Sequence, residues 1–246
     1  MMSLKNINLL SISLKQYFYK LKAYTNLLNR LILTQILALF FSLVGGTGMM
    51  SSSNGELLVS LKTYSAGTVI VFSFLWIVIV AILLTTKQYK KIEIPLVVNR
   101  LSGSLSDVGF LLTASVFAGI TSSLAGVFLR VIMYFTFDRS KIIFDGFFLT
   151  FSDLLLGMVV AILYMGLISA IGYFIGMLAQ VNMAFVILTP VVIFGSLRVY
   201  TDFYQTAFRF FAFEVSLPLF ALKVISLSIV LFGASLFLSN RMEVGK

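Results

Sequence analysis

The sequence predicts an all-α membrane protein with six transmembrane helices and an amphipathic helix at its amino terminus. Hydrophobic residues make up 60% of the 246 residues, and charged residues make up only 11%, whereas a soluble domain carries about 25%. Long uncharged stretches separate the charges, and roughly 20 apolar residues suffice to cross a membrane. A soluble globule, a disordered chain and a basic nucleic-acid binder are therefore excluded, despite the net charge of +9.

Residues 1–30 are predicted to form a cytoplasmic amphipathic elbow helix. They contain no acidic residue, and Leu10, Leu14, Leu21 and Leu28 recur at helical spacing with basic residues between them. This pattern is typical of a helix that lies on an anionic lipid surface. The helix either fixes the topology as a tail or turns the chain into the first span. Four basic residues are expected at the membrane interface: Lys15, Lys20, Lys22 and Arg30.

Six apolar stretches in residues 31–246 are predicted to span the membrane, at about 31–50, 66–86, 108–136, 152–179, 182–199 and 217–239. The 44 uncharged residues 154–197 would form a helix of about 66 Å, roughly twice the membrane core. This stretch must therefore fold back, and the polar pair Gln180 and Asn182 predicts the turn. A β-barrel would show strands of alternating polarity, and runs such as residues 75–84 do not alternate.

Small residues lie on one face of the fourth predicted span: Ser169, Gly172, Gly176 and Ala179. Small residues at this spacing let two helices approach closely. The stripe predicts close packing within the chain, with a contact between two subunits as the alternative.

Lysine and arginine residues are unevenly divided between the two sides of the predicted bundle. Eleven fall in the amino terminus, the second-to-third loop and the tail, and six fall on the opposite side. Because short cytoplasmic loops carry the excess of Lys and Arg, both termini are expected in the cytoplasm of a multi-pass plasma-membrane protein.

The absence of certain amino-acid types from the sequence excludes several kinds of chemistry. The chain has no His and no Cys, which removes disulfides, thiol nucleophiles, the usual imidazole base and zinc or haem sites. It also lacks a phosphate-binding loop, so any ATPase would be a separate chain. Asp107 and the other carboxylates are expected at or beyond span ends, which argues against a proton- or sodium-driven carrier. We therefore expect no enzyme activity, no catalytic residue and no metal site.

The cytoplasmic loop at residues 87–107 mixes apolar and basic residues on the side that faces water. Exposed apolar side chains flanked by charge predict a surface that docks a partner, and contact with lipid is the alternative. Pro95 suits the first turn of a short helix. The docking candidates are Ile94, Pro95, Leu96, Val97, Asn99 and Arg100.

Six spans, a basic amphipathic first helix and the Ile94-Pro95-Leu96 segment followed by Arg100 resemble the ABC-2-type permease family. The resemblance covers the whole chain in architecture, and its motif is short. Pro95 and Arg100 are five residues apart, whereas the family often has three, and Asp107 stands where a Lys is common.

The resemblance implies an ABC-2 (type V) exporter-like fold whose 87–107 loop is a coupling helix seated in an ABC ATPase subunit. It also implies a second permease subunit, identical or different, beside this one. ATP and Mg would be bound by the partner ATPase, and this chain would hold no cofactor of its own.

An outer re-entrant segment is predicted at residues 200–216. Seven of the fourteen residues from 200 to 213 are aromatic, which is typical of the membrane–water interface. The segment is either an aromatic belt or an outer gate formed by Tyr200, Phe203, Tyr204 and Phe208.

Three residues within or beside the spans are candidates for a translocation path: Gln35, Arg130 and Lys223. The two cations could instead extend to the membrane surface, and Gln35 could hydrogen-bond across helices.

The expected function is that of a permease subunit of an ATP-driven exporter for an amphipathic or apolar substrate, such as a peptide or toxin. The amino-acid usage is typical of a Gram-positive bacterium of low GC content. An immunity permease against lantibiotics or other antimicrobial peptides is the nearest alternative. A channel or carrier that does not use ATP, and a membrane scaffold or intramembrane enzyme, are the others.

Overall fold

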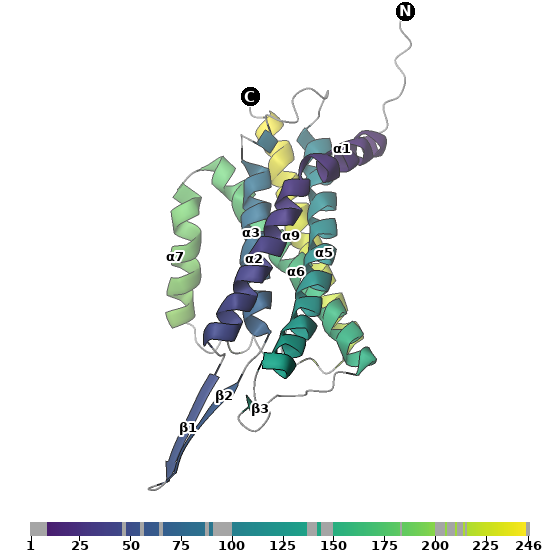
Figure 1. Cartoon of the computed structure of the whole chain (residues 1–246). Coiled ribbons are helices and arrows are strands. Elements are labelled where there is room, and N and C mark those ends of the chain that lie inside the picture. The colour runs from purple at the N-terminus through teal and green to yellow at the C-terminus, as the bar shows by residue number, and fades with distance from the viewer. Residues whose placement is uncertain are drawn as a thin grey trace, which may run out of the picture. The chain divides into compact units, whose positions relative to one another are not determined.

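The computed structural model describes residues 9–45, 48–54, 57–63, 66–86, 89–90, 100–136, 142–143, 150–182, 184–199, 205, 210, 214 and 216–244. Helices dominate this part of the chain, and three short strands accompany them (Figure 1). The main helices are α1 (Leu9–Ala23), α2 (Thr25–Gly45), α3 (Gly67–Thr85), α5 (Arg100–Thr136), α6 (Phe151–Val181), α7 (Ala184–Val199) and α9 (Leu217–Val244).

Five of the described helices are long and apolar enough to cross a membrane: Thr25–Val44, Gly67–Thr85, Arg100–Thr136, Phe151–Val181 and Leu217–Arg241. They match five of the six predicted spans. The remaining one, expected at 182–199, is α7, which has 16 residues. At about 1.5 Å per residue α7 measures about 24 Å, less than the roughly 30 Å of hydrocarbon.

The boundaries of three predicted segments were wrong. The amphipathic helix, predicted to extend to residue 30, ends at Ala23. The first span runs from Thr25 to Gly45 rather than from residue 31 to residue 50. The 87–107 loop ends before Arg100, because α5 begins there and already includes Asp107. The Ser106 hydroxyl is satisfied within α5, because it donates to the carbonyl oxygen of Gly103 at 2.7 Å.

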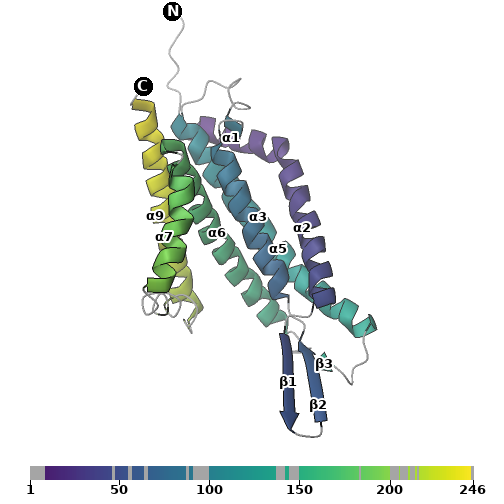
Figure 2. The ribbon, with the colours of Figure 1, turned by 90° about the vertical axis from the view of Figure 1, so that its left-hand side faces the viewer.

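The prediction of a purely helical chain missed a small three-stranded sheet. Strands β1 (Gly48–Asn54) and β2 (Leu57–Thr63) form an antiparallel hairpin, in which Gly48 pairs with Thr63 and Asn54 with Leu57. Strand β3 (Ile142–Ile143) adds to β2 in parallel. The hairpin runs beyond the carboxyl end of α2 as a narrow ribbon (Figure 2). Its serine-rich first strand has low helix propensity, which favours the extended conformation.

The chain divides into two compact units. The first consists of Met1–Thr25, Ile77–Ser115 and Leu163–Lys246, and the second of Asn26–Trp76 and Val116–Ile162. Helices α3, α5 and α6 contribute one part to each unit, and the units are described separately below.

In the first unit, α6 packs closely on α3 through the predicted stripe of small residues. A Cβ placed on Gly176 would lie 2.5 Å from Oγ1 of Thr85, and one on Gly172 would lie 3.2 Å from the carbonyl oxygen of Val78. A side chain at Gly176 would therefore force this contact to shift, and one at Gly172 would crowd it. The expectation of close packing within the chain is confirmed.

The predicted turn between α6 and α7 is also confirmed. Asn182 is not helical, and its Oδ1 accepts a hydrogen bond at 3.0 Å from the backbone N–H of Ala184, the first residue of α7. Asn182 therefore caps α7 with its side chain, a role for which Asn is favoured.

In the second unit, α5 and α6 approach closely at Gly119, where an added Cβ would lie 2.9 Å from the Cα of Ile162. The rings of Phe41 and Phe72 stack α2 on α3, with centroids 6.0 Å apart. Apolar contact and close backbone approach thus contribute to the packing of this unit.

Candidate functional site

Helix α1 buries its polar stripe and exposes its apolar one. Ser13, Gln16 and Lys20 are buried, whereas Leu10, Leu14 and Phe18 are exposed. A helix that lies in a membrane interface directs its apolar side chains to the acyl chains, which agrees with the prediction. The polar stripe, which was expected to face water and lipid headgroups, packs inside the protein.

Lys20 is therefore not one of the cations at the membrane surface, and that part of the prediction is wrong. Its side chain is 1% exposed, because its ammonium group is used inside the first unit. Lys15, Lys22 and Arg30 are exposed and remain candidates for contact with lipid headgroups.

The partner of Lys20 is Asp107 in the second turn of α5. Lys20 Nζ lies 2.5 Å from Asp107 Oδ1, and both side chains are 1% exposed. Nζ also donates to the carbonyl oxygen of Gly103 at 3.0 Å. The second oxygen of Asp107, Oδ2, accepts a hydrogen bond from the Tyr173 hydroxyl of α6 at 3.2 Å. One carboxylate thus joins α1, α5 and α6.

Helix α1 is held on α5 at a second point, one turn before Lys20. The hydroxyls of Tyr17 and Thr113 share a hydrogen bond of 2.8 Å. The Tyr17 ring also covers Gly109, where an added Cβ would lie 3.1 Å from Cδ2 of the ring. By contrast, the buried amide of Gln16 finds no hydrogen-bond partner among the described residues. Polar attachment of α1 therefore depends on Tyr17 and Lys20.

Tyr89 and Lys90 directly precede residues 91–99, here called segment 91–99, and both contact the helices that Asp107 joins. The Tyr24 ring, at the end of α1, makes edge contacts with Tyr89 and Phe110, with centroids 5.4 and 5.7 Å apart. Lys90 Nζ donates to Gln180 Oε1 of α6 at 3.4 Å, and its charge acts on Asp107. We call Lys20, Lys90, Asp107, Tyr173 and Gln180 the Asp107 cluster.

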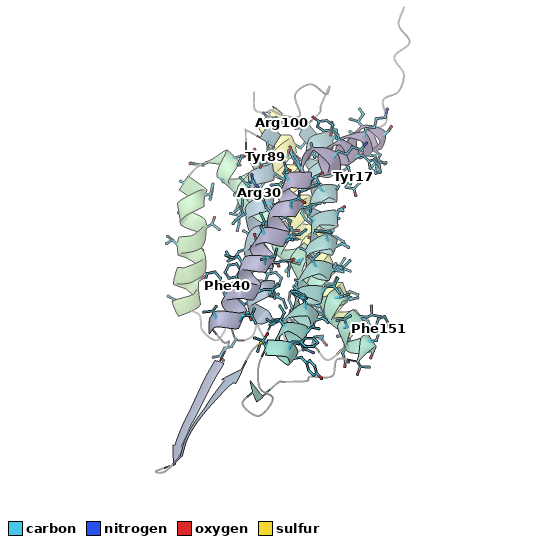
Figure 3. The ribbon with its side chains drawn as sticks, in the orientation of Figure 1. Tyr17, Arg30, Phe40, Tyr89, Arg100 and Phe151 are labelled. Carbon is cyan, nitrogen blue, oxygen red and sulfur yellow. The ribbon has the colours of Figure 1, made fainter. Side chains whose placement is uncertain are left out.

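The Asp107 cluster therefore holds the chain on both sides of segment 91–99. Tyr89 and Lys90 precede the segment, and Gly103 and Asp107 follow it. Tyr17, Tyr89 and Arg100 lie at the same end of the first unit (Figure 3). A displacement of segment 91–99 would act directly on the elements that the cluster joins.

A buried charge is expensive unless it is paired and hydrogen-bonded, and ionisable groups within membrane helices are a sign of function. The sequence prediction placed Asp107 at a span end and missed its burial. One available signal was the spacing of Ser13, Gln16 and Lys20, which places three polar residues on one face of α1. The other was an acid where the resembling family has a Lys.

Most of the predicted docking and gate residues lie outside the described residues. These are Ile94, Pro95, Leu96, Val97 and Asn99 of the loop and Tyr200, Phe203, Tyr204 and Phe208 of the outer segment. Arg100 is described, as the exposed first residue of α5.

None of the three candidates for a translocation path is a member of the Asp107 cluster. Gln35 is buried in the second unit, and its Nε2 donates to Oγ of Ser73 and Oγ1 of Thr121 at 3.1 and 3.0 Å. Gln35 therefore links α2, α3 and α5, as expected if its role is to hydrogen-bond across helices. Arg130 is half-buried near the end of α5.

Lys223, near the start of α9, is paired with residues that precede the helix. Its ammonium forms an ion pair with Glu214 and lies 3.9 Å from the centroid of the Phe210 ring. It also donates to the carbonyl oxygen of Phe210 at 3.4 Å. Lys223 thus fastens part of the predicted outer segment to α9.

Within the described part of the chain, no group of three His, Cys, Asp or Glu residues could hold a metal ion. Comparisons with protein-family models, with curated proteins and with solved structures give no match to this chain.

Proposed function

We propose that this chain is the transmembrane subunit of an ATP-driven exporter of the ABC-2 type, worked by a separate ATPase chain. The observation that carries the proposal is the Asp107 cluster, which fastens both flanks of segment 91–99 to α1, α5 and α6. Segment 91–99 and Arg100 would form the surface that the ATPase contacts.

The proposed mechanism requires a stiff connection between this surface and the membrane helices. Arg100 begins a continuous helix of 37 residues, about 55 Å long. Because Asp107 lies in its second turn and is bonded to α1 and α6, a push on the start of α5 would move three helices together. ATP-driven closure of the partner chains would supply that push.

The proposed substrate is amphipathic or apolar, such as a helical peptide, and the termini are proposed to be cytoplasmic. The five candidate spans carry exposed faces made mostly of large apolar residues. In the second unit, the amide N–H groups of Gln35 already donate to Ser73 and Thr121, which leaves them little capacity to bind a polar solute. A second permease subunit would complete the path.

The test is ATP-dependent peptide uptake into inverted membrane vesicles, in which export from the cell appears as uptake. The vesicles contain the chain and, in turn, each ABC ATPase of its source organism. A fluorescent amphipathic helical peptide serves as the probe. We expect one ATPase to co-purify with the chain and to drive peptide uptake. Arg100→Glu should abolish both, whereas Arg241→Glu, which changes an exposed arginine near the end of α9, should leave both intact.

Equal uptake in vesicles without any ATPase, or ATPase stimulation that is indifferent to Pro95→Ala and Arg100→Glu, would overturn the proposal. The first result would favour the second candidate, a carrier that does not use ATP. One observation supports that candidate: Asp107 is a fully buried carboxylate in a candidate span, the kind of group that proton relays use. Uptake driven by a pH gradient alone would identify it.

A further inference from the structure

Three residues of the first unit meet at one ammonium group near the start of α9. We call Phe210, Glu214 and Lys223 the Lys223 clamp. The Lys223 ammonium forms an ion pair with Glu214, donates to the carbonyl oxygen of Phe210 at 3.4 Å and lies 3.9 Å from the centroid of the Phe210 ring. An ammonium has three N–H donors, so a carboxylate, a carbonyl oxygen and a ring face can engage all of them.

Water reaches the ion pair of the clamp. The Lys223 side chain is 23% exposed and the Glu214 side chain is 21% exposed, whereas Lys20 and Asp107 are each 1% exposed. Breaking a fully buried pair is strongly destabilising, but a pair in contact with water contributes less and is weakened by salt. The pair of Lys223 and Glu214 can therefore open at a lower free-energy cost than the pair of Lys20 and Asp107.

Ser216, which lies between Glu214 and α9, has an unsatisfied hydroxyl while the clamp is closed. Its carbonyl oxygen accepts the N–H of Phe220 at 3.0 Å, so Ser216 is the N-cap residue of α9. Its hydroxyl oxygen is buried and has no hydrogen-bond partner among the described residues. An N-cap hydroxyl usually accepts from the second or third N–H of its helix, and the second residue here, Pro218, has none. A buried hydroxyl without a partner costs free energy, which contact with water would recover.

The residues of α9 on either side of Lys223 are packed inside the first unit. Phe220 is 5% exposed, and its ring centroid lies 5.0 Å from that of Tyr164 in α6. Val224 is also buried. An event that breaks the clamp can therefore displace residues 214–216 and leave α9 in place.

We propose that the Lys223 clamp is a latch: when the ion pair of Glu214 and Lys223 opens, residues 214–216 leave the start of α9 and Ser216 becomes accessible to water. The ion pair favours the closed state, and hydration of the Ser216 hydroxyl favours the open one. Lys223 is the residue that sets the balance between these two states. A role of the latch in substrate exit rests on the proposed exporter function, whereas the opening itself does not.

The test places a single thiol at the latch, because the chain has no cysteine. The Ser216→Cys variant is reacted in lipid nanodiscs with N-ethylmaleimide, a small neutral reagent that reaches both faces of the membrane. Since the Ser216 hydroxyl oxygen is buried, a thiol in its place should react only when the latch opens. The measured quantity is the rate of labelling with Lys223 unchanged, with Lys223→Met and with Lys223→Arg.

Lys223→Met should accelerate labelling by about tenfold or more, because hydrogen bonds to charged groups contribute at least that factor to an equilibrium. Loss of a nearby cation would by itself slow the reaction, since cations favour the reactive thiolate, so an acceleration reports opening. Lys223→Arg keeps the cation and should preserve most of the protection. Lys223→Glu combined with Glu214→Lys should react more slowly than Lys223→Glu alone.

Arg241→Met is the matched control. It removes a cation that lies 5.2 Å from the Phe237 ring near the other end of α9, and it should leave the labelling rate unchanged. If Lys223→Met does not fold, as judged by thermal unfolding, Glu214→Gln takes its place and should also accelerate labelling.

Equal labelling rates for Lys223→Met and Lys223→Arg would overturn the latch. Labelling needs no ATPase, so the latch and the exporter can fail separately. Acceleration without ATP-driven peptide uptake would refute the exporter and keep the latch, and uptake without acceleration would do the reverse.

Discussion

Lys20 and Lys22 have the same side chain two positions apart, yet the structure gives them opposite environments. Lys20 is buried against Asp107, whereas Lys22 is exposed. A helix rotates by about 100° per residue, so two positions move a side chain to another face. Composition predicted an amphipathic basic helix, but it could not tell which lysine faces the protein, because that depends on a carboxylate 87 residues away.

Replacing Lys20 should therefore cost far more than replacing Lys22. Lys20→Met leaves the Asp107 carboxylate buried without its ion-pair partner, which should lower the free energy of unfolding by about 3–5 kcal/mol. Lys22→Met should change it by less than about 0.5 kcal/mol, as for an ordinary surface substitution. Thermal unfolding in nanodiscs measures both.

A similar loss of stability from both variants would show that the buried pair adds nothing. The pair exchange Lys20→Asp with Asp107→Lys provides a further check. It keeps one charge of each sign in the same place and should recover part of the loss, although Tyr173 and Gly103 would then meet different partners.

Helices were the features that the sequence predicted best. The turn at Asn182 followed from the polar pair Gln180 and Asn182, and the packing of α6 on α3 followed from the stripe of small residues that includes Gly172 and Gly176. Both are local signals. The hairpin of β1 and β2 could not be predicted in this way. Its pairing joins residues up to 15 positions apart in an almost uncharged stretch, such as Gly48 and Thr63. The first residues of β1 directly follow the apolar first span and were therefore assigned to that span.

The contact between α6 and α3 predicts opposite effects for two glycines of the same helix. In Gly176→Ala the new methyl would lie 2.5 Å from Oγ1 of Thr85, so the Thr85 side chain or the two helices must shift. Overpacking of this kind typically costs about 1–3 kcal/mol. In Gly166→Ala the methyl meets nothing within 4 Å, and the higher helix propensity of Ala should add up to about 1 kcal/mol.

The midpoints of thermal unfolding of the two glycine variants, measured in the same lipid, test this prediction. We expect the midpoint to fall for Gly176→Ala and to rise for Gly166→Ala. If Gly176→Ala were as stable as the unchanged chain, α6 and α3 could not be in contact along this face. Gly176→Ala combined with Thr85→Ala, which removes both Thr85 atoms that an added Cβ would meet, Oγ1 at 2.5 Å and Cγ2 at 2.9 Å, should be less destabilised than the sum of the two single variants.

For the complete chain, composition predicted a multi-pass membrane protein, and the five long apolar helices agree with it. Composition could not predict the division into two units, because α3, α5 and α6 are each continuous in sequence but contribute to both. Nor could it locate the Asp107 cluster, which gathers residues from four separate parts of the chain. Sidedness remains a prediction from the distribution of Lys and Arg.

Sidedness can be measured directly in a chain without cysteine. A membrane-impermeant maleimide added to intact cells should label Ser52→Cys in β1 and should not label Lys15→Cys, an exposed position of α1. Both should react in permeabilised cells. Labelling of Lys15→Cys alone in intact cells would reverse the proposed orientation, and with it the assignment of segment 91–99 to the cytoplasm.

The short helix α7 has a consequence for the surrounding bilayer. Leu188, Val191 and Val192 are more than half exposed, and the helix is about 6 Å shorter than the hydrocarbon that it would meet. Such a mismatch is relieved by thinning the bilayer locally. The protein should therefore gather lipids with short acyl chains beside α7 and unfold at a higher temperature in C14 than in C20 phosphatidylcholine nanodiscs. An equal midpoint in both lipids would show that α7 does not deform the membrane.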